Sequence, residues 1–543
     1  MPSLSRRTFL RSSSAGAALA AGGAGLLTGC HSGPAKKNNA AVNTKVKLPT
    51  YKRYEGAKPD MPPTPGGVQP AFLRYPADPV SCVDGKPGKG GPLSAMVMVY
   101  AAAPPSPPKN KFWATLNDAL NVDLKLRMIL SSAFAEKLAV TVAGDDIPDV
   151  VQLAGSVPNT PELLAAKFQP LTEFLSGDNV LDYPLLANFT EEQWRTTVFN
   201  GEIYGLPIPR EKVGGIMYRR DDIFEKLGVN KQPASYAEFK DVCKELTDEK
   251  SHRWATANWG GLVNFIQQML GAPNGWKVEN GKFISEYEDE TYKKALSDTA
   301  ALIKAGYLHP DAFSDTLLPK DLYGGGTTPM TIDNYSAWTG YISSYYPADP
   351  KMRIGAMLPP DYDSSTKAMI RRGGPSYSTA IFKKADKDRI RELLRVANYL
   401  ASPFGTKEYL IRRWGLRNVD FTMKNGNVSL TKQGVAESIS SVGYIADAPW
   451  AIYEPGHPEE TKKEYDYQLK AVPMTVPNPA IGLFSNTSTT KGAQLGDLIK
   501  NAQEDILQGR KPLSFWDDTL SSWREQGGDA IRKEYEEAYK EMH

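Results

Sequence analysis

The sequence predicts an α/β protein, because short apolar runs of strand length alternate with stretches of helical period along most of its 543 residues. Strands are predicted at residues 92–100, 121–128 and 150–153, with helical stretches at 116–120 and 133–142 between them. Strand, helix and strand in this order indicate βαβ units in a parallel sheet. A chain of this length is expected to form two to four domains.

The same alternation continues through the rest of the chain. Ser235-Tyr-Ala-Glu238 is a capping box for a helix that runs to residue 246, and Gly228 ends the helix before it. The remaining predicted strands are 214–218, 330–332 and 354–358, and the remaining predicted helices are 221–227, 292–305, 389–400, 497–508 and 531–540. No internal repeat interrupts this order.

Residues 1–29 have the features of an export signal. Basic residues near the start precede a small-residue apolar run at 15–27, which is too short for the roughly 20 residues of a spanning helix. Arg6-Arg7 followed by Phe-Leu resembles a twin-arginine signal, and Leu27-Thr-Gly-Cys30 resembles a lipobox. We therefore predict export, cleavage before Cys30, and palmitate-type acylation of that thiol, which would hold the protein at the extracellular face of the cell membrane.

Residues 30–90 are predicted to form a Pro-rich tether. Prolines recur with glycine between residues 49 and 87, and no hydrophobic period survives there. Such a composition favours an extended, semi-rigid spacer. We expect its later part, from about Phe72, to pack on the folded body.

Charge and cysteine content exclude several function classes. The formal net charge is +2, and removal of the three arginines of the signal leaves about −1, so nucleic-acid binding is not expected. Apart from Cys30, only Cys82 and Cys243 remain; a disulfide between them is possible, but a chain folded before export favours two free thiols.

Motifs of the common enzyme classes are absent from the sequence. It contains no G-x-S-x-G, H-E-x-x-H, P-loop or G-x-G-x-x-G pattern, and its five histidines are scattered. Asp178, Asn179 and Asp182 lack the spacing of an EF-hand loop, so a helix start is favoured over a calcium site. We expect no catalytic residue, no metal and no cofactor.

One long segment resembles a known family. Gly201-Glu-Ile-Tyr-Gly-Leu-Pro-Ile-Pro-Arg210, continued at 217–221 and 224–228, resembles the crossing segment of family 1 extracellular solute-binding proteins, the lipoproteins that supply ABC importers. The further landmarks lie in the family's order at 144–150, 305–310, 329–333, 399–402 and 527–534, so that the resemblance covers about residues 92–543.

The resemblance implies a two-lobe, periplasmic-binding-protein-like fold of type II, whose lobes are joined by crossing strands and close over a ligand by hinge motion. By order in the family, residues 91–207 and 376–455 form the N-lobe, and 208–375 and 456–543 form the C-lobe. Trp523 and Gly527-Gly528 look most like the oligosaccharide-binding members.

The function implied is that of a lipid-anchored, monomeric receptor, which binds a carbohydrate between its lobes and delivers it unaltered to an ABC permease. Three alternatives stay open. A secreted glycoside hydrolase or lyase shares aromatic rings and carboxylates with a sugar-binding protein. The same fold also suits a peptide, a polyamine or a metal complex, and a sensor subunit that passes a signal to a partner is the third alternative.

A sugar ring has an apolar face and a belt of hydroxyls, so its site needs aromatic rings with polar groups around the edge. Trp259 occupies the place where the family carries a ligand-stacking aromatic residue, and Asp333-Asn334-Tyr335 follows a predicted strand, with Trp338 one turn further. Polar groups at strand ends in α/β sheets point into the crevice. Core packing is the alternative for the tryptophans, and helix capping for Asp333 and Asn334.

Four further residues are candidate ligand contacts. Gln152 ends a predicted strand of the N-lobe, and Trp450 lies near a third predicted crossing. Arg210 lies on the crossing segment, where an interlobe salt bridge is the alternative. Tyr377 ends the stretch Gly373-Gly374-Pro375-Ser376-Tyr377, for which a hinge turn is the alternative.

Overall fold

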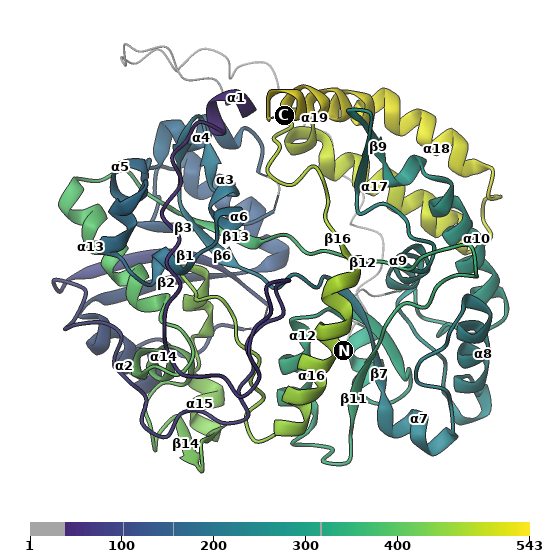
Figure 1. Cartoon of the computed structure of the whole chain (residues 1–543), viewed down its shortest axis with the longest axis horizontal. Helices are drawn as coiled ribbons and strands as arrows, with labels where there is room; N and C mark the ends of the chain where they lie inside the picture. Colours follow the sequence, from purple (N-terminus) through teal and green to yellow (C-terminus); the bar gives the residue numbers. More distant parts are fainter. Residues whose placement is uncertain (1–37, 101, 156, 315–317, 543) are drawn as a thin grey trace, which may run out of the picture. The chain divides into compact units, whose positions relative to one another are not determined.

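The computed structural model describes residues 38–542 except for 101, 156 and 315–317, and the predicted signal and Cys30 lie outside the described residues (Figure 1). Residues from Asn38 onward form one compact unit, in which helices and strands alternate as the α/β prediction requires. None of the helices in this part of the chain combines the length and apolar composition needed to cross a bilayer.

The first of two main sheets contains five strands in the order β2-β1-β3-β13-β6. These strands are β1 (Pro92–Val99), β2 (Asp123–Leu130), β3 (Val150–Leu153), β6 (Leu206–Pro209) and β13 (Ser376–Phe382). β1 pairs in parallel with β2 and β3, whereas β13 runs antiparallel to β3 and β6. Helices α2 (Lys111–Leu120) and α3 (Phe134–Ala143) connect β1, β2 and β3, so the predicted βαβ order is confirmed.

Alternating side chains of β1 divide the core of this sheet between its two faces, because successive strand residues point to opposite sides. Leu93, Ala95 and Val97 belong to the buried cluster that contains α2. Met96 belongs to the cluster that contains Phe134 of α3. Both faces are therefore covered, as expected for a sheet built from βαβ units.

The second main sheet is antiparallel, with the order β10-β7-β11. Its strands are β7 (Gly215–Arg220), β10 (Met330–Asn334) and β11 (Ile354–Met357). Met217 packs in a cluster with α8 (Tyr236–Leu246), α9 (Trp259–Met269) and α10 (Glu290–Lys304). Tyr218 packs on the other face, with α12 (Ala337–Tyr345) and α16 (Pro458–Ala471).

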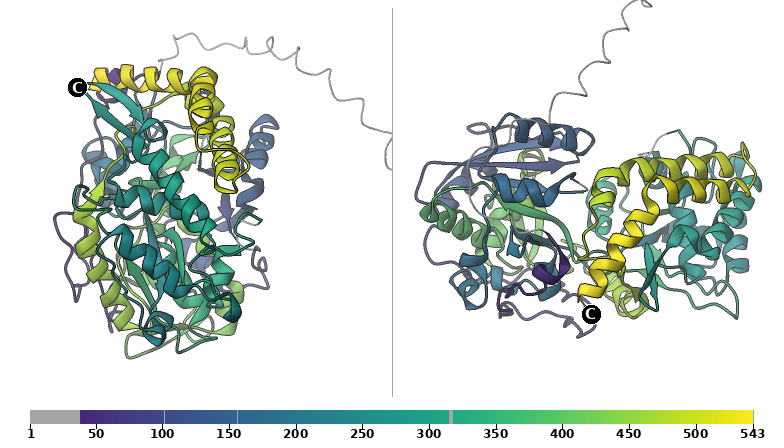
Figure 2. Two further views of the ribbon diagram at one scale, coloured as in Figure 1. Left: turned by 90° about the vertical axis from the view of Figure 1, so that its right-hand side faces the viewer. Right: turned by 90° about the horizontal axis from the view of Figure 1, so that it is seen from above.

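The other helices surround these two sheets. Their bounds are α1 (Ala40–Asn43), α4 (Thr160–Lys167), α5 (Thr172–Leu175), α6 (Glu191–Arg195), α7 (Asp221–Leu227), α11 (Leu318–Gly324), α13 (Lys387–Leu400), α14 (Lys407–Trp414), α15 (Lys432–Glu437), α17 (Asn486–Leu507), α18 (Phe515–Trp523) and α19 (Asp529–Met542). The remaining short strands pair in two-stranded ribbons. These are β4 (Val198–Phe199) with β5 (Glu202–Ile203), β8 (Trp276–Glu279) with β9 (Lys282–Ser285), β12 (Ile370–Arg371) with β16 (Thr475–Val476), and β14 (Phe421–Lys424) with β15 (Asn427–Leu430). Figure 2 shows α17, α18 and α19, in yellow, packed together.

Most predicted elements are present, and their ends differ where the sequence carries little periodicity. Helix α7 has the predicted bounds and ends at Gly228, whose φ is +69°. Helix α17 begins eleven residues earlier than predicted, at Asn486, because its first turns are rich in Ser, Thr and Gly and carry no apolar stripe. The hinge turn considered at 373–377 does not extend to residue 377, because β13 begins at Ser376.

Two connections between the sheets run side by side at residues 210–214 and 371–375. The Arg210 N–H donates to the Pro375 carbonyl at 3.1 Å, and the Gly373 N–H donates to the Lys212 carbonyl at 2.9 Å. These paired segments lie where the family resemblance implies crossing strands. The lobe boundaries that follow from the resemblance remain predictions.

The Pro-rich segment follows the surface of the body, as the purple trace in Figure 1 shows. Its packing begins earlier than predicted: the Thr50 N–H already donates to the Gly177 carbonyl at 2.9 Å. Ala71, Phe72 and Tyr75 are buried, and the Tyr75 hydroxyl donates to the Thr406 carbonyl at 2.5 Å. Proline keeps the backbone extended without repeating hydrogen bonds, so single side chains can insert into the body with no hydrophobic period in the sequence.

Both described cysteines are free thiols, as favoured from the sequence. Cys82 contacts the core of the first sheet, and Cys243 is buried in the core of the second. Burial raises the pKa of the Cys82 thiol to about 12 and that of Cys243 further, so both thiols stay protonated at neutral pH.

Candidate ligand-binding site

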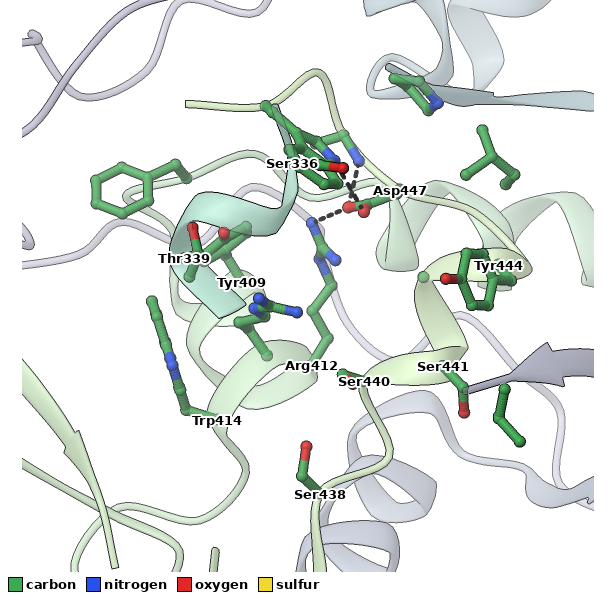
Figure 3. A pocket seen from close by; sticks show the side chains of 18 of the residues that line it. Ser336, Thr339, Tyr409, Arg412, Trp414, Ser438, Ser440, Ser441, Tyr444 and Asp447 are labelled. Atoms are coloured by element: carbon green, nitrogen blue, oxygen red, sulfur yellow. Dashed lines mark hydrogen bonds and ion pairs between the residues drawn. The ribbon is translucent and has the colours of Figure 1, made fainter. Parts of the chain in front are cut away.

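A cavity of about 560 Å³ opens where β1, β6 and β10 end, and it is lined from both main sheets (Figure 3). Tyr100 follows β1, Arg210 follows β6, and Ser336 with Thr339 follows β10. The last turn of α14 and residues 438–455 complete the lining. Ligands of open α/β sheets bind outside the carboxyl ends of the strands, and the volume lies in the range of about 300–1,000 Å³ for small-molecule sites.

An arginine–aspartate pair fixes one wall of this cavity. Arg412, whose side chain is 4% exposed, places Nη2 2.8 Å from Asp447 Oδ1, and it donates through the same nitrogen to the Ser402 carbonyl at 2.9 Å. Figure 3 shows Arg412 directed at Asp447. The Trp450 Nε1–H donates to Asp447 Oδ2 at 3.3 Å. Asp447 therefore holds an arginine and a tryptophan in fixed positions at the rim.

A second arginine lies against two aromatic rings. The Arg210 guanidinium carbon is 4.3 Å from the centroid of the Tyr377 ring and 5.2 Å from that of Trp450. Tyr377 is hydrogen-bonded to the Tyr100 hydroxyl, and its ring centroid is 5.7 Å from that of Tyr444. Burial and the hydrogen bond to Tyr100 raise the pKa of Tyr377, so this hydroxyl stays neutral. We call Tyr100, Tyr377, Tyr444 and Trp450 the aromatic wall.

The Pro-rich segment supports the cavity from behind. The Tyr75 ring packs on Phe404 with centroids 4.7 Å apart, and on Trp414 at 5.7 Å with the planes nearly perpendicular. Phe404 and Trp414 both line the cavity. A second cavity, of about 600 Å³, lies under residues 51–72 and shares Arg210 and Trp450 with the first. Arg210 and Trp450 thus form the partition between the two spaces.

A pair of buried carboxyl groups lies directly behind the lining. Glu454 is 1% exposed, and its Oε1 accepts a hydrogen bond from the Thr339 hydroxyl at 2.5 Å. Glu464 Oε2 accepts a hydrogen bond from the Tyr335 hydroxyl at 3.3 Å. Each carboxyl leaves its other oxygen without a hydrogen-bond partner among the described residues, and a proton shared between the two groups would satisfy both. Burial raises the pKa of Glu454 to about 7 and that of Glu464 well above its ordinary value.

The structure brings three of the sequence-predicted site residues together. Arg210 and Trp450 line the cavity, and Tyr377 lies against Arg210 behind the rim. Arg210 has no interlobe salt bridge of the kind considered from the sequence, within the described part of the chain. The Arg210 guanidinium instead lies against the aromatic rings of Tyr377 and Trp450.

The four predicted contacts at the end of β10 and after it do not line this cavity. Trp338 is 1% exposed and packs edge-on against Tyr218, whereas Ser336 and Thr339 on either side of it reach the cavity. Tyr335 is buried with Glu464. Asp333 accepts a hydrogen bond from the Tyr341 hydroxyl and pairs with Lys320, both at 2.9 Å. Asn334 is exposed outside the lining.

Gln152 and Trp259 also lie outside this cavity. Gln152 is fully buried in the first sheet, where it accepts a hydrogen bond from the Met98 N–H at 2.8 Å and donates to the Ser378 hydroxyl at 3.1 Å. Trp259 begins α9 and stacks on Phe313 with centroids 5.6 Å apart. The side chain of Gln152 is thus engaged by hydrogen bonds within the first sheet, and that of Trp259 by the Phe313 ring.

Sequence reasoning missed several lining residues, among them Tyr100, Arg412, Arg413, Tyr444 and Asp447. Arg412 and Arg413 end α14, where basic residues are common because they complement the helix dipole, so that their position suggested no ligand. The run Arg412-Arg413-Trp414 was the one feature of the sequence that could have indicated a ligand site here.

Comparison with known proteins defines the class of this protein. Residues 112–419 match the model of a family described as bacterial extracellular solute-binding protein. This match spans more than half of the chain, and the chain belongs to that family.

Three similar proteins illustrate the family. Lipoprotein LipO of Bacillus subtilis (strain 168) is 23% identical over 82% of this chain and 91% of its own length. The polygalacturonan/rhamnogalacturonan-binding protein YtcQ of the same organism is 23% identical over 84% of this chain and 93% of its own. A solved structure of an HMO-binding, ABC-transporter-associated solute-binding protein from Bifidobacterium longum infantis superposes with a TM-score of 0.62, at 15% identity, over 84% of this chain and 99% of that one. The predicted periplasmic-binding-protein-like fold is confirmed by this likeness.

Proposed function

We propose that this protein is a receptor that binds an oligosaccharide in the cavity at Arg210 and Trp450 and delivers it to an ABC permease. Family membership makes it an extracellular solute-binding protein. The names of two similar proteins, one binding polygalacturonan or rhamnogalacturonan and one binding HMO with an ABC transporter, support a carbohydrate as the solute and a permease as the partner.

The lining is the observation that carries this proposal. The Trp450 and Tyr444 rings offer flat apolar faces, and the hydroxyls of Ser336, Thr339 and Ser441 supply hydrogen-bond donors and acceptors around them. This combination suits a sugar, whose ring has an apolar face and an edge of hydroxyl groups.

The cavity is lined by residues from both sheets, so a ligand there would contact both lobes. Ser336 and Thr339 follow the second sheet, whereas Tyr100 follows the first. A ligand that touches both sides stabilises the closed arrangement relative to the open one and shifts the population towards it. Closure would then offer the permease a single surface built from two lobes.

The enzyme alternative receives less support from the same lining. Glycosidases use two carboxyl groups on either side of the scissile bond. Among the described residues that line the cavity, Asp447 is the single carboxylate, and it is paired with Arg412. Glu454 lies behind the lining and is hydrogen-bonded to Thr339. The lining therefore supports reversible binding of a sugar better than its hydrolysis.

Attachment to the membrane through acylated Cys30, after export by a twin-arginine route, completes the proposal. The motifs that support it are in the sequence before the described residues, and the lipoprotein LipO is a similar protein. Expression of Cys30→Ser in the native host tests the anchor: we expect the protein to move from the membrane fraction to the medium. Retention of the variant in the membrane fraction would contradict lipid anchoring.

Binding is tested by titrating the protein without its signal against a panel of neutral and acidic oligosaccharides, followed by intrinsic fluorescence and calorimetry. We expect saturable binding of at least one sugar, and its recovery intact after long incubation. Trp450→Ala should weaken binding about ten-fold or more, since it removes an aromatic face at the site. Trp259→Ala is the matched control and should leave the Kd within about two-fold. Cleaved sugar would favour the enzyme alternative, and equal losses in both variants would contradict the assignment of the site.

A further inference from the structure

The charges that line the ligand cavity are unbalanced. Three arginines line it, Arg210, Arg412 and Arg413, against the single carboxylate of Asp447. No lysine, histidine, glutamate, asparagine or glutamine is among the described residues of the lining. A site for a neutral sugar commonly uses carboxylates and amides to accept hydrogen bonds from the sugar hydroxyls, because these side chains supply the strong acceptors. Beside its hydroxyl groups, this lining instead offers more cationic donors than carboxylate acceptors.

Only one of the three arginines has its charge compensated. Arg412 pairs with Asp447 at 2.8 Å. Around Arg210 and Arg413, no carboxylate oxygen of the described residues lies within the 4.0 Å of an ion pair. The guanidinium groups of Arg210 and of the exposed Arg413 therefore have no ion-pair partner among the described residues.

Arg210 is held in a geometry that suits an anion. Its guanidinium carbon lies 4.3 Å from the Tyr377 centroid and 5.2 Å from the Trp450 centroid, so the group is held against two rings. No hydrogen bond to its guanidinium nitrogens exists within the part of the chain that the structure describes. The N–H groups at the edge of the guanidinium remain available, and their fork matches the two oxygens of a carboxylate.

The nearest acidic groups outside the lining form no ion pair with Arg210 or Arg413 among the described residues. Glu454 and Glu464 lie behind the lining and are positioned to share a proton, and burial raises the pKa of both. Glu211 is also buried, and burial raises its pKa. A carboxylate brought by the ligand would give Arg210 and Arg413 the ion-pair partners that they lack among the described residues.

We propose that the ligand is an acidic oligosaccharide, built from uronic acids, whose carboxylates pair with Arg210 and Arg413 while a sugar face packs on the aromatic wall. This inference rests on the proposed function and narrows it to one class of sugar. A charge-assisted hydrogen bond contributes more than a neutral one, so the carboxylates should decide which sugars bind.

The test compares each acidic sugar with its neutral counterpart. Trisaccharides of galacturonate, glucuronate and mannuronate are titrated by calorimetry alongside the same compounds with their carboxyl groups reduced to alcohols. We expect at least one uronate to bind, and its reduced form to bind about 10- to 100-fold more weakly. We also expect the affinity for the uronate to fall as NaCl is raised from about 50 to 500 mM, because salt screens charge pairs that solvent can reach.

Charge variants separate a specific contact from the overall charge of the protein. Arg210→Gln and Arg413→Gln should each weaken uronate binding by about ten-fold or more and leave the weak binding of the reduced sugar unchanged. Arg417→Gln removes the same charge at an exposed position outside the lining and should leave the Kd for the uronate unchanged. Thermal unfolding of each variant verifies that it is folded.

The possible outcomes separate this inference from the proposed function. Equal or tighter binding of the neutral, reduced sugars would overturn the uronate assignment and leave the receptor function standing. Equal effects of Arg210→Gln and Arg417→Gln would also overturn it. Failure of every sugar, acidic or neutral, to bind would overturn the proposed function itself.

Discussion

Replacement of Glu454 by glutamine should make the protein more stable at neutral and alkaline pH. Glu454 is 1% exposed, and one of its carboxyl oxygens has no donor among the described residues. Burial raises its pKa from its ordinary value of 4.5 to about 7. Because the folded pKa lies above the unfolded one, the unfolded chain ionises first as the pH rises. The stability that the protonated group provides is therefore complete below pH 4.5 and is lost as the pH rises towards 7.

The size of the effect follows from the shift in pKa. At about 1.4 kcal/mol for each pKa unit, the difference between 4.5 and about 7 corresponds to about 3 kcal/mol in the free energy of unfolding. Glutamine does not ionise, keeps the oxygen that accepts from the Thr339 hydroxyl, and offers Glu464 an N–H in place of the shared proton. The variant should therefore gain up to about 3 kcal/mol over the wild type between pH 4.5 and 8.

Urea unfolding at a series of pH values measures this gain as the difference between Glu454→Gln and the wild type. Glu459→Gln provides the matched control, because Glu459 is an exposed carboxylate at the start of α16. Its difference from the wild type should stay within about 0.5 kcal/mol at every pH. A Glu454→Gln difference that does not change with pH would refute the reasoning, since it would mean that the folded protein holds Glu454 with an ordinary pKa.

Three further predictions concern packing and charge. Phe72→Ala should lower the free energy of unfolding by about 3–5 kcal/mol in urea unfolding, because the ring is buried against Phe404; an effect below about 1 kcal/mol would mean that the Pro-rich segment does not belong to the folded body. Arg412→Ala should cost about 3–5 kcal/mol by the same measurement, because it leaves Asp447 without its partner at 2.8 Å, and a neutral result would contradict the pairing. Cys82 and Cys243 should each react with a thiol reagent only after denaturation, as followed by mass spectrometry, because burial raises the pKa of both thiols; rapid labelling of the native protein, or a disulfide in the purified chain, would contradict this.

Periodic segments of the fold could be predicted from the sequence, and non-local pairings could not. Strand β3 and helix α7 have the predicted bounds, because each combines an apolar pattern with a clear end such as Gly228. Strand β13 was assigned in part to a turn. Its place between β3 and β6 depends on residues more than 160 positions away, and no local pattern encodes that partner.

The candidate site shows the same division between local and non-local information. Arg210 and Trp450 lie on connections between the sheets, and their position along the chain was sufficient to select them. Trp338 has the composition of a sugar contact, but a helix places it one residue away from Thr339 and on the buried side. The face of a helix that a side chain occupies depends on tertiary packing, which the sequence of a short helix does not specify.

The most direct test of this account is a crystal structure of the protein bound to an oligosaccharide that it binds in solution. We predict an intact sugar in the cavity, with a ring face on Trp450, a charged or polar group on Arg210, and contacts to Ser336 or Thr339 from the second sheet. A sugar bound elsewhere, with this cavity left open, would contradict the central claim.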